Sequence, residues 1–502
     1  MTQSASALTP VIVGIGEIIE RPEPGKVGTE PLELMREAIL RANMDSGANL
    51  LGQLDSLDVI CQLGWSYRNL PHQLAEALGL KAVKANESPV GGNMPTKLMV
   101  DVGNKIASGE LKCAVICGGE SAQSLATAKQ TEQTPAWTPA EKPENPRENV
   151  VKLLEPLALE YGLRMPIDVY PLYDNACRAA WNQSHSVYQQ ESGIIGAEMS
   201  KVAAQNPYAW KPQAVSPEKI TTPGPGNRLT MHPYTKLMVA NPIVNQAAAF
   251  IITSLELARA AGVPDQKMVY IGSGACGMEP RDFMARSRYD YAPAMEAVLK
   301  EVLALNELNP EELDLVELYS CFPIVPKLAR RSLRLPDDLP LSVTGGLAFF
   351  GGPANNYMTH AICSMTRALR NGQGRNGLLY GNGEFLTKHH AAVISAVPIK
   401  RLVENRDLQK EINANYPGVP QLLAQYEGPS ILETFTLKYD RDGQPAYAVV
   451  VARTPDNHRH LARVETDDPS TLAFLIDPEQ EPVGQNGTAY QDRNSLIRWR
   501  YS

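Results

Sequence analysis

Residues 91–121 read GGNMPTKLMVDVGNKIASGELKCAVICGGES, and this stretch decides the fold that the sequence predicts. Apolar residues at helical spacing predict a helix over residues 94–108, and Gly109 follows as a C-terminal stop signal. The apolar run 114–117 then predicts a buried strand that ends in glycines. A glycine turn, a helix and a buried strand in this order favour a mixed or parallel sheet covered by helices.

The same alternation of strand and helix occurs before this stretch and again later in the chain. Residues 11–16 and 57–60 predict strands, and residues 31–42 and 70–78 predict helices. The second series comprises the predicted strands 268–271, 315–318, 378–380 and 391–395 and the predicted helices 293–305 and 357–370. Two similar series indicate an internal duplication. Between them, residues 245–261 are apolar nearly all round and predict a buried helix.

These patterns divide the chain into three regions. Residues 1–265 form a first half with an insertion, about residues 125–240, that is rich in Pro, Tyr, Trp and Asn. Residues 266–405 form a second half. Residues 434–452 read as a hairpin, which predicts that residues 420–502 form a small antiparallel β-barrel of five or six strands.

The composition excludes several classes of function. Lys and Arg total 47 against 55 for Asp and Glu, so the net charge of -8 argues against a nucleic-acid partner. No segment approaches the ~20 apolar residues that cross a bilayer, and the first residues lack the basic start and long apolar run expected of a secretory signal. The seven cysteines have no metal-binding spacing, which predicts reduced thiols, no metal and a cytoplasmic location.

Four segments resemble, in order and spacing, the active-site loops of the thiolase superfamily. They are residues 91–95 (GGNMP), 317–322 (ELYSCF), 344–353 (TGGLAFFGGP) and 377–384 (GLLYGNGE). The resemblance covers about residues 8–400 and is greatest to the acetyl-CoA acetyltransferase or thiolase-like group, near the sterol-carrier-protein thiolases. It implies a duplicated, five-layered αβαβα thiolase fold with a loop insertion. The C-terminal region is similar to the oligonucleotide-binding-type barrel that is fused to, or partners, some thiolase-like proteins.

The resemblance also locates the catalytic side chains of a thiolase, and this chain lacks them. The nucleophilic cysteine falls at Gly92 or Asn93, the activating histidine at Gly352, and the acid/base cysteine near Gly381. Without a thiol at the helix start, the covalent acyl-enzyme route has no nucleophile. The sequence therefore predicts an acyltransferase-type enzyme that acts on carbon–carbon bonds of CoA thioesters without the usual cysteine thioester.

Other side chains near these loops are candidates for chemistry and binding. The candidate catalytic residues are His389, Cys321, Tyr357 and His360, although Cys321 also fits a small buried apolar residue and the histidines fit helix caps. The free N–H groups at the start of helix 94–108 are expected to bind an oxyanion. The candidates for binding substrate or CoA are Asn93, Tyr319, Ser320, Gly352, Asn355, Asn356, Gly381, Asn382, Gly383 and Lys236.

Two other functions stay open at this point. One is a cysteine-free aldolase or lyase acting on 3-hydroxyacyl-CoA through an enolate. The other is a protein that binds acyl-CoA without catalysis, or a scaffold whose barrel recruits a partner enzyme. In each case a CoA thioester is the substrate or ligand, and no covalently bound cofactor is expected. Thiolases pair through a strand of the first half, so a homodimer through residues 114–117 is a further expectation.

Overall fold

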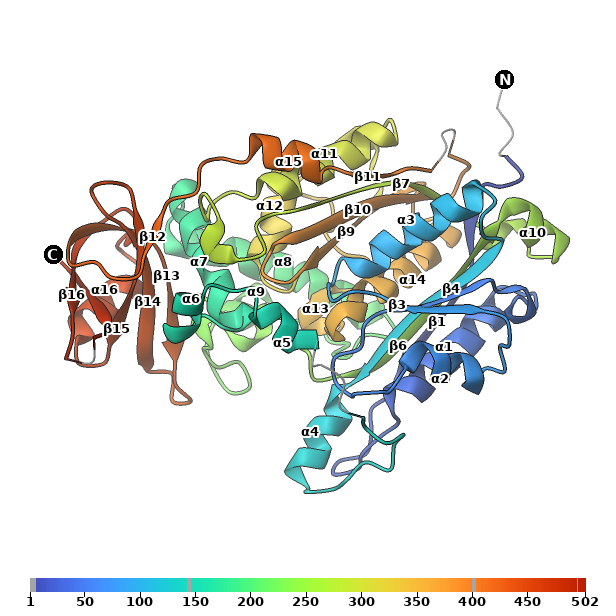
Figure 1. Ribbon diagram of the computed structural model, residues 1–502, viewed down its shortest axis with the longest axis horizontal. Coiled ribbons are helices and arrows are strands. Elements are labelled where there is room, and N and C mark those ends of the chain that lie inside the picture. Colours follow the sequence, from blue (N-terminus) through green and yellow to red (C-terminus); the bar gives the residue numbers. More distant parts are fainter. Residues whose placement is uncertain (1–5, 142–145, 400–402, 494) are drawn as a thin grey trace.

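The computed structural model describes residues 6–141, 146–399, 403–493 and 495–502. Figure 1 shows a helix-covered sheet at one end of the molecule and a small barrel at the other, with the helices of the insertion between them. These helices are α6 (Pro156–Glu160), α7 (Pro166–Ala180), α8 (His185–Gln205) and α9 (Pro217–Thr221).

The first half contributes five strands to the large sheet in the order β3-β2-β4-β6-β1. The central strand β4 (Cys113–Ser121) is parallel to β2 (Ser56–Val59), which in turn is parallel to β3 (Lys84–Glu87). On its other side β4 is antiparallel to β6 (Asn245–Ser254), and β6 is antiparallel to β1 (Pro10–Ile19).

The second half repeats this arrangement in the order β7-β10-β9-β8. Strand β10 (Lys388–Ser395) is antiparallel to both β7 (Val269–Met278) and β9 (Asn376–Gly383), and β9 is parallel to β8 (Leu315–Leu318). The pairing β7-β10-β9-β8 therefore matches β1-β6-β4-β2, so the predicted duplication is confirmed.

Helices form three layers around the strands. The helices α3 (Met94–Ala107) and α14 (Tyr357–Arg370) contact each other and strands of both halves, so they form the central layer. On the outer faces, α1 (Pro31–Asp45) packs on the first half and α11 (Pro293–Leu305) packs on the second half. These contacts give the predicted five-layered αβαβα architecture.

The prediction of a buried helix over residues 245–261 is wrong. Residues Asn245–Ser254 form strand β6, and only Leu255–Ala260 form a helix, α10. Every residue of β6 is buried, because helices cover the strand on both faces. A run that is apolar on all sides fits a strand buried on both faces as well as it fits a buried helix.

The C-terminal region forms a closed five-stranded barrel in the order β13-β14-β15-β17-β16, with β16 returning to β13. The contact between β15 and β17 is parallel, so the barrel is not wholly antiparallel as predicted. The strand bounds are β13 (Gly428–Tyr439), β14 (Pro445–Arg453), β15 (Arg459–Glu465), β16 (Asn486–Gln491) and β17 (Ile497–Tyr501). Strand β5 (Met231–His232) of the insertion pairs with β13 and attaches the barrel to the core.

The expected pairing of two subunits through residues 114–117 does not fit the sheet. Strand β4 is paired on both sides, with β2 and β6, and has no free edge. The sheet edge of the first half is β3.

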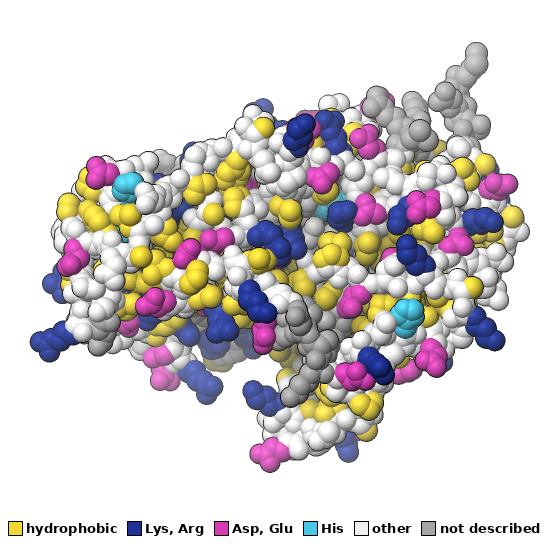
Figure 2. Space-filling model, in the orientation of Figure 1, with side chains coloured by type: hydrophobic (Ala, Val, Ile, Leu, Met, Phe, Trp, Pro, Cys, Tyr) yellow, Lys and Arg dark blue, Asp and Glu magenta, His cyan; other side chains and the backbone are white. Residues whose placement is uncertain are grey.

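Among the described residues, no helix has both the length and the apolar character needed to cross a bilayer. Figure 2 shows acidic and basic side chains interspersed over the visible face.

Candidate functional site

A cavity of about 440 Å³ lies where the loops that resemble those of thiolases meet. Gly92, at the turn before α3, lies on its wall, and so do Tyr319 and Cys321 after strand β8. A further wall comes from the insertion and includes Arg164, Met165, Pro166, Ile167 and Tyr170. Most of the lining side chains are apolar, so the few polar groups among them define what the cavity can bind.

The position of the missing nucleophile is occupied by a tyrosine. A Cβ atom at Gly92 would lie 2.6 Å from the hydroxyl oxygen of Tyr319 and 2.5 Å from the backbone oxygen of Asn382. Neither separation is possible for a real side chain. The phenol of Tyr319 therefore stands where a thiolase would direct its thiol, and glycine at position 92 makes this arrangement possible.

Two backbone donors at the start of α3 are free. Within the described residues, the N–H groups of Gly92 and Asn93 donate no hydrogen bond to another backbone group, whereas the next N–H, that of Met94, donates to Gly91. Gly92 lines the cavity, so a carbonyl oxygen bound there can accept these hydrogen bonds at the positive end of the helix dipole. The oxyanion site that the sequence predicts at this turn stays a prediction.

A second polar group in the cavity combines three side chains. Nδ2 of Asn382 donates to the hydroxyl oxygen of Tyr170 over 2.8 Å and lies 3.8 Å from Sγ of Cys321. The backbone N–H of Leu386 also donates to the Tyr170 hydroxyl, over 3.0 Å. Both lone pairs of this oxygen are thereby occupied, and the hydroxyl itself donates a long hydrogen bond of 3.4 Å to the backbone oxygen of Glu384.

The thiol and the phenol on the cavity wall are neutral. Burial raises the pKa of Cys321 to about 12, and hydrogen bonds from Tyr170 and neighbouring groups lower it only in part. Burial likewise raises the pKa of Tyr319 well above its ordinary value. At neutral pH Cys321 is therefore a thiol and a poor nucleophile, whereas Tyr319 keeps a proton that it can donate.

The structure does not bring the other three predicted catalytic residues to the cavity. His389 is buried against Tyr380, whose hydroxyl lies 2.7 Å from Nδ1. Nδ1 of His360 lies 2.8 Å from the carboxylate of Glu17. The hydroxyl of Tyr357 donates to Glu317 over 2.6 Å. Each of these three side chains is buried outside the cavity lining and contacts another buried polar side chain. These contacts indicate a structural role.

The predicted binding residues fall into two groups. Those that line the cavity are Tyr319, Gly352, Asn355, Asn382 and Gly383. Those that lie outside the lining are Asn93, Ser320, Asn356, Gly381 and Lys236.

The residues outside the lining have separate roles in the structure. Ser320 accepts a hydrogen bond from the N–H of Leu347, and Asn356 donates to the carbonyl of Gly118. A Cβ at Gly381 would lie 2.9 Å from the Cα atom of Asn93, just before α3, which explains why glycine is needed there. Lys236 is exposed.

Sequence reasoning missed the side chains that the insertion supplies. Tyr170 stacks on Phe322, with ring centroids 4.2 Å apart, and the two rings form one wall of the cavity. Phe322 could have been found, since it belongs to the segment ELYSCF. Tyr170 lies on α7 with no motif around it, and only the folding of the insertion over the loops brings it to the site.

Fold and cavity together define a thiolase-type fold, a duplicated α/β core whose loops meet at the start of the central helix α3. A monomeric SCP2-thiolase-like protein type 1 from Mycobacterium smegmatis has a similar crystal structure. The TM-score is 0.82 at 28% identity, over 99% of this chain and 100% of that one. The family described as "Thiolase-like protein type 1 additional C-terminal domain" matches residues 407–494. The predicted resemblance to the thiolase superfamily is therefore confirmed.

Two more distant structures share the core. The Ltp2-ChsH2(DUF35) aldolase has a TM-score of 0.60 at 18% identity, over 77% of this chain and 98% of that one. Human mitochondrial 3-ketoacyl-CoA thiolase in complex with CoA has a TM-score of 0.56 at 15% identity, over 79% and 100% of the two chains. At these identities the likeness shows the fold alone. No curated protein sequence matches the chain.

Proposed function

We propose that the chain binds a CoA thioester in the cavity and makes or breaks a carbon–carbon bond next to the thioester carbonyl, without forming an enzyme thioester. The observation that carries this proposal is the Tyr319 phenol at the position of the nucleophile, where Gly92 has no side chain. A thiolase-type mechanism needs a thiolate at this point. The chain offers a neutral hydroxyl instead.

The role that we assign to the N–H groups of Gly92 and Asn93 is to bind the thioester oxygen, which is supported by the position of Gly92 on the cavity wall. Negative charge develops on this oxygen when an enolate forms, and one such donor in a protected site contributes about 3 kcal/mol. Because the cavity is mostly apolar, water competes weakly for these donors. This arrangement supports enolate chemistry and does not require a nucleophile.

The aldol direction or its reverse on a 3-hydroxyacyl thioester fits these groups. In cleavage, the bond between C2 and C3 breaks and its electron pair moves onto C2 as the enolate. The proton of the 3-hydroxyl passes to the Tyr319 oxygen, and the original Tyr319 proton is delivered to C2. The phenol is regenerated, a carbonyl compound and a shorter thioester are released, and no other reactant is consumed.

Two measurements test this proposal. Intact-protein mass spectrometry after incubation with acetyl-CoA is expected to show no covalent adduct. With a series of 3-hydroxyacyl-CoA thioesters of increasing acyl size, Tyr319→Phe is expected to lower kcat about 100-fold or more, because it removes the proton donor. The dissociation constant of Tyr319→Phe for the same thioesters should change little. Tyr490→Phe, a tyrosine of the barrel, is the matched control.

An acetyl group found on Cys321 would contradict the proposal and restore a covalent acyl-transfer route. Unchanged turnover in Tyr319→Phe would remove the assigned proton transfer. Both outcomes can be measured without knowing the natural acyl group.

One observation favours a second candidate, binding of acyl-CoA without turnover. The carboxylate on the cavity wall, Glu384, is held by ion pairs with Arg281 and Lys388. Burial opposes these partners, but they outweigh it and keep the pKa of Glu384 below its ordinary value, so it is a weak base. Tight binding with no turnover across the thioester series would favour this candidate.

We also infer that the barrel is of the oligonucleotide-binding type. Two features support this assignment. The barrel closes in the strand order first-second-third-fifth-fourth, and helix α16 (Pro469–Ile476) lies between the third and fourth strands. The division of the chain near residues 265 and 420 is part of the same proposal, supported by the family match to residues 407–494.

A further inference from the structure

Helix α7 connects the barrel to the cavity. Tyr170, in its second turn, reaches the cavity wall. On the barrel side, the backbone oxygen of Leu172 accepts a hydrogen bond of 2.6 Å from the hydroxyl of Thr434, and Nδ2 of Asn175 donates to the backbone oxygen of Phe435 over 3.0 Å. All of these groups are buried, so strand β13 fixes the helix that carries Tyr170.

A β-bulge in β13 directs this contact. The register of β13 against β14 shifts between Leu432 and Thr434, which leaves Glu433 as the extra residue. Bulges re-aim side chains, and here Thr434 is directed to α7. The carboxylate of Glu433 is bound by Arg453 at 2.7 Å and by Arg459 at 2.7 Å.

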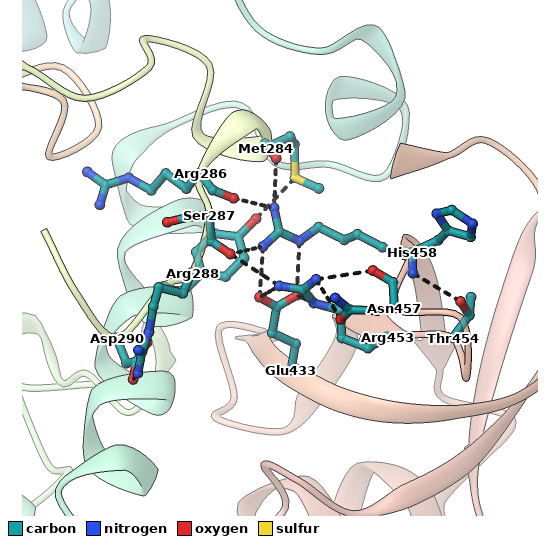
Figure 3. Close-up of polar contacts among 12 residues, drawn as sticks. Met284, Arg286, Ser287, Arg288, Asp290, Glu433, Arg453, Thr454, Asn457 and His458 are labelled. Carbon is teal, nitrogen blue, oxygen red and sulfur yellow. Dashed lines mark hydrogen bonds and ion pairs between the residues drawn. The ribbon is translucent and has the colours of Figure 1, made fainter. Parts of the chain in front are cut away.

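The two arginines hold a loop of the second half. Figure 3 shows Glu433 and Arg453 beside the chain that runs through Met284, Arg286 and Ser287. Arg459 donates to the backbone oxygens of Met284 and Arg286, over 2.8 and 2.7 Å. Since Arg459 is fully buried, this loop is fixed to the barrel.

Arg286 carries the connection from this loop to the cavity. Its guanidinium donates to the backbone oxygen of Leu386 and lies over the ring of Tyr173, 4.7 Å from the centroid. The N–H of Leu386 donates to the Tyr170 hydroxyl over 3.0 Å. Two separate paths from the bulge, one through Leu172 and one through Arg286, thus end at the same hydroxyl.

We propose that the bulge residues Glu433 and Thr434 of the barrel are positioning residues for Tyr170, so that the C-terminal domain sets the polar geometry of the acyl-binding cavity. This inference rests on the proposed function in assigning the cavity to a CoA thioester. The barrel then acts as a built-in part of the site and not as an independent module.

A double-mutant cycle on the intact chain tests the proposal, with octanoyl-CoA as the probe. Thr434→Val removes one hydroxyl while keeping the shape of the side chain, and it is expected to raise the dissociation constant about threefold or more. In a Tyr170→Phe background the same change should have less than a twofold effect, because the hydroxyl that Thr434 positions is gone. Equal effects in both backgrounds would overturn the proposal.

The matched control is Glu481→Gln. Glu481 also joins the barrel region to α7, through Arg178 at 2.5 Å, but at the far end of the helix. Glu481→Gln is expected to keep the dissociation constant for octanoyl-CoA within twofold of the wild-type value. A rise in this constant as large as that of Thr434→Val would indicate a merely structural role for both contacts.

A readout without ligand separates this inference from the proposed function. Hydrogen–deuterium exchange of the peptide containing Leu386 should be faster in Thr434→Val than in the wild type, and unchanged in Glu481→Gln. If the wild type binds no octanoyl-CoA, the proposed function fails, and the exchange rate of this peptide still decides whether the bulge positions Tyr170. Unchanged exchange in Thr434→Val would overturn the inference.

Discussion

Two glycines occupy the positions where the thiolase resemblance expects a cysteine and a histidine, and their surroundings differ. A Cβ at Gly92 would lie 2.5 Å from a backbone oxygen, whereas a Cβ at Gly352 would have no neighbour closer than 3.5 Å. Gly92→Ala is therefore expected to lower the free energy of unfolding by about 1–3 kcal/mol, because the backbone must shift.

Gly352→Ala is the control for this prediction and should have the wild-type midpoint in urea denaturation. Equal midpoints for Gly92→Ala and the wild type would mean that the turn before α3 yields easily. The missing nucleophile could then be restored by one substitution, contrary to our interpretation of the site.

Buried histidines give the protein an acid-sensitive stability. Burial lowers the pKa of His390 to about 4, and a 2.9 Å contact with Asn405 offsets this only in part. Between pH 6.5 and 4 the unfolded chain binds a proton at this position and the folded chain does not, so stability falls as the pH falls. When the pH is lowered from 6.5 to 5, the free energy of unfolding of His390→Gln should therefore fall by about 1.5 kcal/mol less than that of the wild type.

Urea denaturation at the two pH values measures this difference. His72→Gln, at an exposed position on α2 (Leu70–Ala77), is the control for replacing a histidine by glutamine. If His390→Gln and the wild type lose equal stability on acidification, His390 is not the buried neutral group that the structure indicates.

At the scale of elements, local patterns predicted most helices and strands, and β6 shows where they failed. The helix over residues 94–108 was predicted almost to its ends, because its apolar spacing and Gly109 are local signals. The run at residues 245–254 is a strand because β4 and β1 flank it and helices cover both of its faces. That environment comes from residues far away in the sequence, so periodicity alone could not distinguish strand from helix.

Strand β1 shows how closely the layers pack. A Cβ at Gly16 would lie 2.6 Å from the backbone nitrogen of Ala42 and still nearer to the backbone oxygen of Ala38, both on α1. Gly16→Ala is expected to cost at least about 1–3 kcal/mol of stability, because a helix backbone cannot move aside as a side chain can. Gly52→Ala, with open space around it, should be neutral or slightly stabilising. Similar thermal midpoints for the two variants would contradict this packing.

At the scale of the whole molecule, the resemblance predicted the loops that carry the candidate site but not how the site is completed. Gly92, Tyr319, Cys321 and Asn382 all lie in the four recognised segments and line the cavity. His389, from the strand after the last segment, lies outside the cavity lining, and Nδ1 of its ring contacts the hydroxyl of Tyr380. The wall supplied by the insertion depends on the barrel that holds it, and contacts between such distant regions leave no signal in a single sequence.

The barrel and the core should therefore unfold together. Glu433 is the counter-ion of Arg453 and Arg459, and burial alone would raise its pKa, but the two arginines hold that pKa below its ordinary value. Glu433→Ala leaves both guanidinium groups without a counter-ion at a buried interface, which is expected to cost about 3–5 kcal/mol. Glu433→Gln keeps hydrogen-bonding capacity and should cost less. Urea denaturation followed by circular dichroism and by tryptophan fluorescence should give coincident transitions for the wild type and separate transitions for Glu433→Ala. Coincident transitions and a loss below about 1 kcal/mol in Glu433→Ala would show that this ion cluster does not join the two parts.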